Sequence, residues 1–503
     1  MLHTRTVIAA CVGFLTGVGI ASIAFAYVIV PWIPIAVVCS AAALAAAIGM
    51  RGAHRRFAVV AMSALVFGIV RFAIAVPVPA GADADTVEGR VVRVVPAGDG
   101  RMRVAVRDAA YDAPIVVSLT RSDVRYGDVI RVSCAPRQPR YLRDRLTAAG
   151  ECWVGAYVTP QLLARGGGSP TLRALGALRE RFAATNAAHL TGNARAVTAS
   201  IALGDRTATT GALLEAFRTT GTVHALVVSG GHMSIIGMLL LGALRHIPVH
   251  RRTALLATVA ILAAFVVMVG ADPSAVRGAL MAAALIAVEL CGRIASRVRI
   301  LLLVAVVMVA VHPYVLAYDL GFQLSFAAVA GIVLLTTVFE RALPGRHAWG
   351  REVRAAIAAS AAATIATAPL LIGVFGTFSI IGVLANVPVL LLLTPLLVAA
   401  FAFLGLGTLL PPLAPLLAWP AGAFAHSVAW IVQRAAAIPW AQAHFAPWDW
   451  WFIIGCYAFL GACVIGSMRA RGERILSPFR VLSADAALLS GAPVQCEEQR
   501  MRS

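Results

Sequence analysis

The chain has 503 residues, of which 60% are hydrophobic and 13% are charged, and its mean hydropathy is +0.85. A soluble protein of this length could not bury so much apolar surface in cores of ordinary size, so the excess is expected to face lipid. The formal net charge is +19, and arginine carries all the basic charge because the sequence contains no lysine. This charge fits the cytoplasmic arginines that orient membrane helices, and a polyanionic partner is the alternative. Eight cysteines without a CxxC pair exclude a disulfide scaffold and predict no metal or cofactor site.

Three apolar runs near the N-terminus are long enough to cross a membrane, at 7–30, 33–49 and 57–76. The first run is long and lacks a convincing small-residue cleavage site, so we interpret it as a retained anchor. Arg5 precedes the first run, and Arg51, Arg55 and Arg56 separate the second from the third. Because such clusters mark the cytoplasmic side, the N-terminus is expected inside and the chain beyond residue 76 outside. Residues 1–80 are therefore assigned to N-terminal transmembrane helices.

Residues 83–165 have a different character and predict a small external β domain. Five β-rich runs, separated by turn residues, predict strands at 86–95, 101–108, 114–120, 127–135 and 152–159. The run 101–107 alternates apolar and polar residues, as in a strand with one buried face. With a helix near 140–149, this pattern favours a five-stranded barrel of the OB type. Cys134 and Cys152 close the last two strands on the oxidising side and are candidates for a disulfide, the alternative being two separate buried thiols.

The membrane pattern returns after a linker and amphipathic helices at 166–221. Apolar runs between arginine-rich gaps predict a transmembrane channel domain over 222–467, with a disordered cytoplasmic tail at 468–503. The expected spans are 222–244, 253–270, 273–292, 299–316, 319–338, 354–375, 379–405, 412–436 and 449–467. The proline-rich stretch 387–420 also allows a span plus a re-entrant helix. The fold class is thus a polytopic α-helical membrane protein of about 12 spans with one external OB-like β domain, both termini being cytoplasmic.

Polar residues that interrupt the apolar runs are the candidate functional residues, because such groups are costly inside a membrane. The densest patch, from 202 to 232, contains Asp205, Arg206, Arg218, His224, Ser229 and His232. His232 follows Ser229 by one helical neighbour, which allows a Ser–His hydrolase pair, but the sequence shows no positioned acid or oxyanion device. A two-histidine metal site lacks a third ligand. Close helix packing at the glycines, or a broken helix that lines an aqueous path, are the simpler interpretations.

Three further patches lie in later spans. Arg277 stands just inside a span, where an arginine pairs with another group, lines a cavity or extends to the interface. Asp319 and Gln323 share one helix face, and Asn386 precedes a proline within a span. Hydrogen bonding between helices is the unspecific explanation of these last three.

The order of these patches resembles the ComEC-type competence family, the inner-membrane channels for DNA uptake in natural transformation. The matching stretches, within roughly residues 60–410, are 203–206, 217–232, 273–281, 319–326 and 384–388. The resemblance implies a bacterial cytoplasmic membrane protein with an external OB-like domain that engages DNA and a helical channel that passes one strand inward. It also implies an external DNA-receptor protein and a cytoplasmic ATP-driven motor, and it leaves assembly as a homo-oligomer open.

Two features depart from the family pattern. The family's serine-glycine-leucine-histidine string reads Ser229-Gly230-Gly231-His232 here. Many members carry a metallo-β-lactamase-like domain after the channel, whereas this sequence contains no His-x-His-x-Asp-His motif. We therefore expect that this chain is not an enzyme and that a separate nuclease degrades the other strand.

The resulting hypothesis is a channel for single-stranded DNA, with the polar patches along its path. On the external domain the candidate DNA-binding residues are Arg101, Arg103, Arg107 and Arg125, although alternating arginines also suit the solvated face of a barrel. One competing interpretation is a transporter of another solute on the same scaffold. A second is a membrane enzyme that uses His224, Ser229 and His232, and a third is a decayed relative without transport function.

Overall fold

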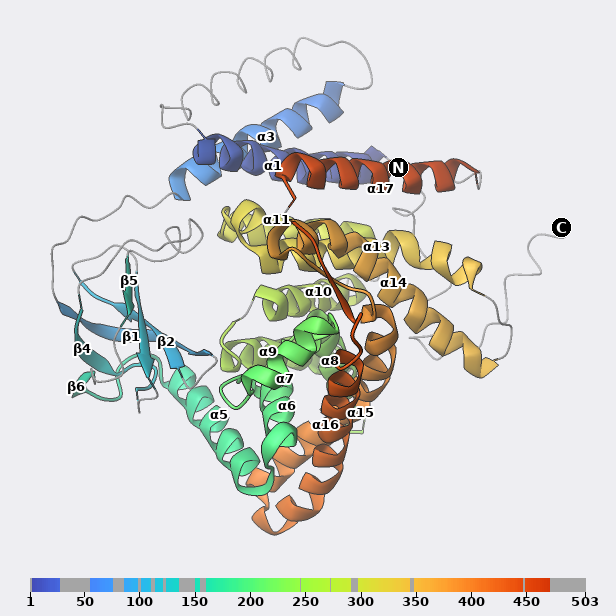
Figure 1. The fold of residues 1–503 in the computed structure, drawn as a ribbon. Helices are drawn as coiled ribbons and strands as arrows, with labels where there is room; N and C mark the ends of the chain where they lie inside the picture. Colours follow the sequence, from blue (N-terminus) through green and yellow to red (C-terminus); the bar gives the residue numbers. More distant parts are fainter. Residues whose placement is uncertain are drawn as a thin grey trace.

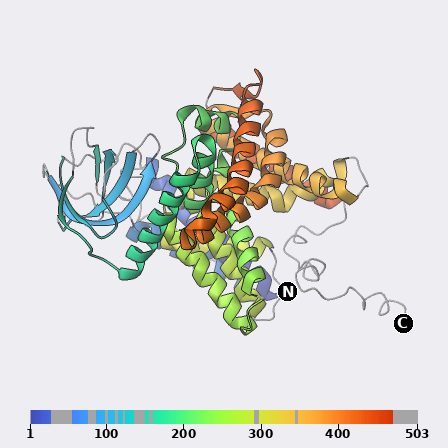
Figure 2. The ribbon, with the colours of Figure 1, turned by 90° about the horizontal axis from the view of Figure 1, so that it is seen from below.

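The computed structural model consists of a small β domain beside a large bundle of helices (Figure 1). It describes residues 2–27, 55–75, 86–97, 101–109, 114–120, 124–134, 150–153, 160–244, 246–271, 273–290, 297–343, 348–446 and 448–470. Seen from below, the β domain lies at one edge of the molecule, next to the helix that follows it in sequence (Figure 2).

The β domain is one sheet of short strands. The strands are β1 (Thr86–Ala97), β2 (Arg101–Arg107), β3 (Ile115–Thr120), β4 (Val129–Ser133), β5 (Gly150–Trp153) and β6 (Gln161–Ala164). Their order across the sheet is β5-β3-β2-β1-β4-β6, and the pairs are antiparallel except for the parallel pair β3–β5. β1 to β5 overlap the five strands predicted from the sequence, whereas β6 was not predicted.

One face of this sheet forms a hydrophobic core, as the alternating sequence predicts. Val104 and Val106 of β2 are completely buried, while Arg103 and Arg107 are exposed. A closed OB barrel would also need β4 to pair with β5, and the strand pairings of the described residues include none between these two. Barrel closure therefore stays a prediction, and the predicted helix near 140–149 lies outside the described residues.

Helices α1 (Leu2–Tyr27) and α3 (Arg55–Ala75) pack together along one side of the bundle (Figure 1). A Cβ atom at Gly13 or Gly17 would collide with the backbone of Ala61 or Leu65 on α3. This spacing of two glycines four residues apart allows the close approach that membrane helices use when they associate. The pair then shares a core with α11 (Arg297–Val311) and α13 (Leu320–Ala342).

Six helices are long and apolar enough to cross a membrane, at 223–244, 251–268, 320–342, 353–375, 382–409 and 411–436. Shorter apolar helices at 7–22, 58–72, 274–288, 298–311 and 450–466 coincide with five more of the predicted spans. The remaining one, 33–49, lies outside the described residues, as does the tail beyond 470. The total of about 12 spans thus stays a prediction.

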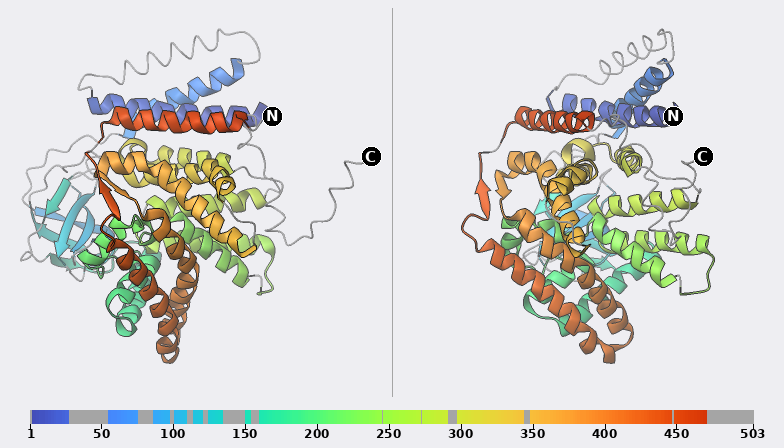
Figure 3. Two further views of the ribbon diagram at one scale, coloured as in Figure 1. Left: turned by 45° about the vertical axis from the view of Figure 1, so that its right-hand side comes forward. Right: turned by 90° about the vertical axis from the view of Figure 1, so that its right-hand side faces the viewer.

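The bundle begins with α8 (Gly230–Leu244), α9 (Arg251–Met268) and α10 (Pro273–Leu290). It continues after α11 with α12 (Val315–Tyr318), α13, α14 (Ala348–Phe375), α15 (Gly382–Leu409), α16 (Ala414–Ala436) and α17 (Trp450–Ala470). The proline-rich stretch is two helices, since α15 runs through Pro388 and Pro395 before α16 begins. The strands β7 (Thr377–Ser379), before α15, and β8 (Gln442–His444), after α16, form a two-stranded ribbon (Figure 3).

The predicted amphipathic segment forms α5 (Pro170–His189), α6 (Gly192–Leu203) and α7 (Gly211–Thr219). Val197 and Ile201 of α6 and Phe217 of α7 are buried in one core with residues of α15 and α16. By contrast, large apolar side chains such as Leu416 and Trp419 on α16 are 72% and 77% exposed. Such a surface suits lipid, so the bundle has a packed interior around α6 and α7 and an apolar periphery.

Candidate functional site

A series of hydrogen-bonded polar side chains links the patch at residues 202–232 to Asn386. His224 lies in the short 3₁₀ turn η1 (Val223–Ala225), and its Nδ1 is 3.1 Å from the carbonyl oxygen of Gly221. Its Nε2 is 3.1 Å from Oδ1 of Asn386 on α15, and Nδ2 of Asn386 donates to Oγ of Ser360 on α14 at 2.9 Å. We call these residues, His224, Asn386 and Ser360, the polar chain.

The polar chain runs from an accessible side chain into the bundle. His224 is exposed, whereas Asn386 and Ser360 are 9% and 3% exposed. A neutral imidazole that donates to Gly221 satisfies every bond if the Asn386 amide presents its nitrogen to His224 and its oxygen to Ser360. The opposite amide orientation requires an imidazolium, because both ring nitrogens then face acceptors. In either state these three polar residues are held together inside helices that are otherwise apolar.

The loop that carries His224 packs closely against the start of α15. Gly221 has a φ of 66°, in the left-handed region that favours glycine, and a Cβ there would stand 3.1 Å from Cβ of Ser379. Beside it, the hydroxyls of Thr220 and Thr222 are 2.8 Å apart, and both residues are fully buried. This stretch of the first patch thus contributes hydrogen-bonding groups to the interior of the bundle.

Ser229 and His232 form a close pair at the start of α8. Oγ of Ser229 is 2.8 Å from Nδ1 of His232, and the Ser229 N–H donates to the same nitrogen at 3.1 Å. Nδ1 is therefore an acceptor and the proton lies on Nε2, which is buried and has no hydrogen-bond partner among the described residues. A Ser–His hydrolase would place a carboxylate at that nitrogen, and no described carboxylate bonds to it. Instead, Asp205 accepts bonds from the N–H and Oγ1 of Thr207, at 2.9 and 2.7 Å.

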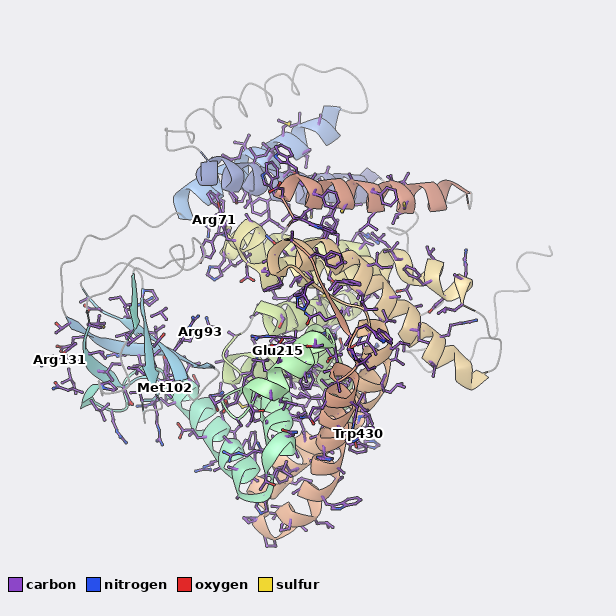
Figure 4. All side chains as sticks on the ribbon, viewed as in Figure 1. Arg71, Arg93, Met102, Arg131, Glu215 and Trp430 are labelled. Carbon is purple, nitrogen blue, oxygen red and sulfur yellow. The ribbon has the colours of Figure 1, made fainter. Side chains whose placement is uncertain are left out.

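The charged residues beside this loop have different surroundings. Arg206 is half-buried in the turn after α6. Arg218 is exposed on α7 and lies 3.5 Å from Glu215, one turn away (Figure 4). Arg277 on α10 is only 4% exposed, and its guanidinium lies over the ring of Phe326 on α13, 5.7 Å from the centroid.

Asp319 and Gln323 make hydrogen bonds to backbone groups where α12 ends and α13 begins. Oδ1 of Asp319 accepts the N–H of Phe322 at 2.9 Å and so caps the N-terminus of α13. Nε2 of Gln323 donates to the carbonyl oxygens of Leu316 and Ala317, at 3.0 and 2.8 Å. These hydrogen bonds of Asp319 and Gln323 thus stabilise the break between α12 and α13.

On the β domain, exposed arginines gather on one face of β1 and β2. Arg90 stands directly opposite Arg107 in the strand register, and both side chains are exposed, as is that of Arg103. Like charges in this position repel each other, so the face favours an anion. Arg125, by contrast, pairs with Glu180 of α5 at 3.0 Å. The Arg101 side chain lies outside the described part of the chain.

Two arginines make structural contacts that the sequence did not predict. Nη2 of Arg93 donates to the carbonyl oxygen of Gly270 at 2.5 Å and joins the β domain to the turn between α9 and α10 (Figure 4). Arg71 on α3 donates to the carbonyl oxygens of Ala310 and Val311, at 2.7 and 2.9 Å, at the end of α11. Each looks in the sequence like an isolated arginine, and only the fold shows which carbonyl it reaches.

Cys134 is disulfide-bonded. The backbone of Cys152 pairs with Val117 in the sheet, while its side chain lies outside the described residues. The predicted pairing of these two cysteines therefore stays a prediction. Among the described residues, no three histidine, cysteine or acidic side chains come together as metal ligands.

The helical part of the chain is similar to known proteins. Residues 201–470 match the family model described as Competence protein. The chain is also similar to ComE operon protein 3 of Bacillus subtilis (strain 168), with 28% identity over 187 residues, which are 37% of this chain and 23% of the relative. The match thus spans less than a quarter of that relative's length. No solved structure matches the chain. The family match begins within α6, in line with the burial of α6 and α7 among the membrane helices.

Proposed function

This chain belongs to the competence protein family, and we propose that it is the ComEC-type membrane channel through which single-stranded DNA enters the cell during natural transformation. The proposal places the β domain outside, both termini in the cytoplasm, and the bundle across the cytoplasmic membrane. An external DNA-receptor protein, a cytoplasmic ATP-driven motor and a separate nuclease would complete the uptake machinery.

The observation that carries the proposal is the polar chain. His224, Asn386 and Ser360 come from three elements of a bundle whose periphery is apolar, and hydrogen-bonding groups at such depth are costly unless they serve a path or a contact. The polar chain starts at the exposed side chain of His224 and continues to the buried side chains of Asn386 and Ser360, as expected for a route that a polar solute follows. A single DNA strand is such a solute.

The exposed arginine face of β1 and β2 supports an encounter with DNA before entry. Arg90 and Arg107 repel each other across the sheet, and a phosphate between them would remove the repulsion. The contact of Arg93 with Gly270 keeps this face close to the α9–α10 turn of the bundle. An OB-type domain at that position would deliver the strand to the bundle.

The decisive experiment measures where labelled DNA goes. In a transformable bacterium, the chromosomal copy is deleted and then restored as the wild type, as Asn386→Ala or as Asn193→Ala, which changes a half-buried asparagine on α6 whose bond to Gln433 is exposed. We expect the deletion to retain label in the periplasm and to lose label in the cytoplasm. Restoration with the wild type or Asn193→Ala should return cytoplasmic label, and Asn386→Ala should return much less at equal protein level. Undiminished cytoplasmic entry in the deletion strain would refute the uptake function.

The deletion strain and one further variant, His232→Gln, separate two other functions from this one. A transporter of another solute would leave DNA entry unchanged on deletion while the flux of its own solute falls. A membrane enzyme would lose turnover on His232→Gln, and the 2.8 Å contact between Ser229 and His232 is the observation that keeps this function open.

A further inference from the structure

At the N-terminus of α8, several backbone N–H groups have no acceptor among the described residues. The first intrahelical bond runs from the N–H of Met233 to the carbonyl of Ser229, at 3.1 Å. The Oγ of Ser229 is 2.8 Å from the His232 ring and does not cap a backbone N–H. Among the hydrogen bonds of the described residues, none satisfies the N–H of Gly230, Gly231 or His232. A helix N-terminus in this state carries a partial positive charge.

A buried arginine points to the same place. Nη2 of Arg277 lies 3.6 Å from the position that a Cβ on Gly230 would occupy. The residue is 4% exposed, and its Nε and Nη1 are buried and have no hydrogen-bond partner in the part of the chain that the structure describes. No ion pair within the described part of the chain includes it. An uncompensated guanidinium is costly in a low-dielectric interior, and the positive end of α8 adds to that cost.

Helices α8 and α10 approach each other closely beside these groups. A Cβ on Gly278, the residue after Arg277, would stand 2.7 Å from Cα of Gly230, so α8 and α10 are in close contact here. The ring of Phe326 covers one face of the guanidinium. The edge of the guanidinium and the first N–H groups of α8 therefore form a compact set of donors, and a small oxyanion with several acceptor oxygens satisfies them together.

We propose that Arg277 and the N-terminus of α8 bind a phosphate oxyanion. In the working protein the occupant is a phosphodiester of the passing strand, an assignment that rests on the proposed function. This site differs from the polar chain, which joins His224 to Asn386 and Ser360 and contains uncharged acceptors as well as donors. The bound phosphate neutralises Arg277 and completes the first turn of α8.

The test measures binding of radiolabelled inorganic phosphate to the full chain in phosphatidylcholine nanodiscs by equilibrium dialysis. We expect saturable binding that Arg277→Gln weakens about tenfold or more, because a charged donor is lost. The matched control is Arg252→Gln, which changes an exposed arginine in the first turn of α9 and should bind phosphate as the wild type does. Absence of saturable binding to the wild type, or equal binding to Arg277→Gln, would overturn the site.

A second readout shows that the variant is folded. The thermal unfolding midpoint of the wild type should rise with phosphate at constant ionic strength, because a ligand of the native state stabilises it. The midpoint of Arg277→Gln should not respond. In phosphate-free buffer it should equal or exceed that of the wild type, because the variant lacks the unpaired charge. A midpoint for Arg277→Gln that rises with phosphate as much as the wild type's would contradict the proposal.

The source of the phosphate is tested by competition. A short oligothymidylate should displace labelled phosphate from the wild type, whereas displacement only by phosphatidylglycerol in the nanodisc would overturn the assignment to a DNA strand. The binding assay involves no DNA uptake, so the two proposals can fail separately. Phosphate binding in a protein whose deletion leaves uptake intact would refute the channel, and uptake by a protein that binds no phosphate would refute the site.

Discussion

The contact between His224 and Asn386 joins residues that are 162 positions apart in the sequence. Asn386 uses both ends of its amide, one toward the imidazole and the other toward Ser360. Because Ser360 and Asn386 are buried, removal of the amide takes away the described hydrogen-bond partner of the Ser360 hydroxyl. The polar chain therefore contributes to stability as well as to the proposed path.

We predict that Asn386→Ala lowers the free energy of unfolding by about 1–3 kcal/mol, since it leaves the buried hydroxyl of Ser360 without its partner and removes the bond to His224. Thermal unfolding of the purified protein in detergent measures this as a lower midpoint. Asn193→Ala is the matched control, because Asn193 makes only an exposed 3.4 Å bond to Gln433 and its removal should change stability by less than about 0.5 kcal/mol. Equal midpoints for the two variants would contradict the buried network.

At the scale of residues, the sequence identified polar positions better than their roles. His224 and Asn386 were both selected because they interrupt apolar runs, and the structure brings them together. Asp319 and Gln323 were selected on the same ground, yet their described hydrogen bonds include backbone groups around the break between α12 and α13. Hydropathy alone does not separate the two cases, because a helix end within the membrane has the same unpaired groups as a polar path.

Close contacts between helices depend on glycines at single positions. A Cβ on Gly278 would stand 2.7 Å from Cα of Gly230 and 2.8 Å from Cγ of Met233, so α8 and α10 could not keep their present separation. Gly405 in α15 has no atom within 4 Å of the corresponding position. The two glycines thus provide a matched pair within the bundle.

Gly278→Ala is expected to destabilise the protein by about 1–3 kcal/mol through overpacking. Gly405→Ala should be neutral or stabilising, by up to about 1 kcal/mol, because alanine favours the helix. Thermal midpoints in detergent measure both variants. A Gly278→Ala protein as stable as Gly405→Ala would show that α8 and α10 are not packed as described.

The end of α11 depends on an arginine from another helix. Arg71 on α3 donates two bonds to carbonyl groups of the last turn of α11, where backbone acceptors lack partners within the helix. We predict that Arg71→Gln costs about 1–3 kcal/mol of stability, as expected for charged hydrogen bonds. Arg71→Lys, which keeps the charge but not the planar fork, should fall between Arg71→Gln and the wild type. A loss in the lysine variant as large as in the glutamine variant would indicate that the fork geometry matters more than the charge.

At the scale of elements, the long apolar runs of the sequence were sufficient to predict where the described helices of the bundle lie. The β-rich runs between turn residues were sufficient to predict strands that overlap β1 to β5. The short strand β6 was missed, since its four residues, Gln161–Ala164, do not alternate and all are exposed. Glycine contacts such as Gly13 with Ala61 were missed for a different reason. They depend on which helices become neighbours, and a hydropathy profile contains no information on that.

For the whole molecule, the position of the β domain follows from a few contacts with the helices. Arg93 bonds to Gly270 in the α9–α10 turn, and Arg125 pairs with Glu180 on α5. Gly167 bonds to the carbonyl of Gly127, and the Tyr126 hydroxyl is 3.4 Å from the Ser169 N–H, at the start of α5. The sequence predicted a β domain over residues 83–165 but none of these contacts, because they join segments of opposite character through single polar groups.

These contacts lead to a prediction of topology. The β domain lies at the end of the bundle that holds the α9–α10 turn, and the arginine pattern assigns that turn to the outside. Arg341, at the end of α13, belongs to a gap that the same pattern assigns to the cytoplasm. The two sites for single cysteines are therefore Leu163 of β6, which is 42% exposed, and Arg341, which is also exposed.

With the other free cysteines replaced, a membrane-impermeant maleimide should label Leu163→Cys in intact spheroplasts. It should label Arg341→Cys only after lysis. The disulfide at Cys134 is retained in both proteins, so the β domain keeps its fold during the measurement. The reverse labelling pattern would place the arginine face of β1 and β2 in the cytoplasm, where it could not receive DNA from outside. Inward transport through this bundle therefore requires that the maleimide label Leu163→Cys, and not Arg341→Cys, in intact spheroplasts.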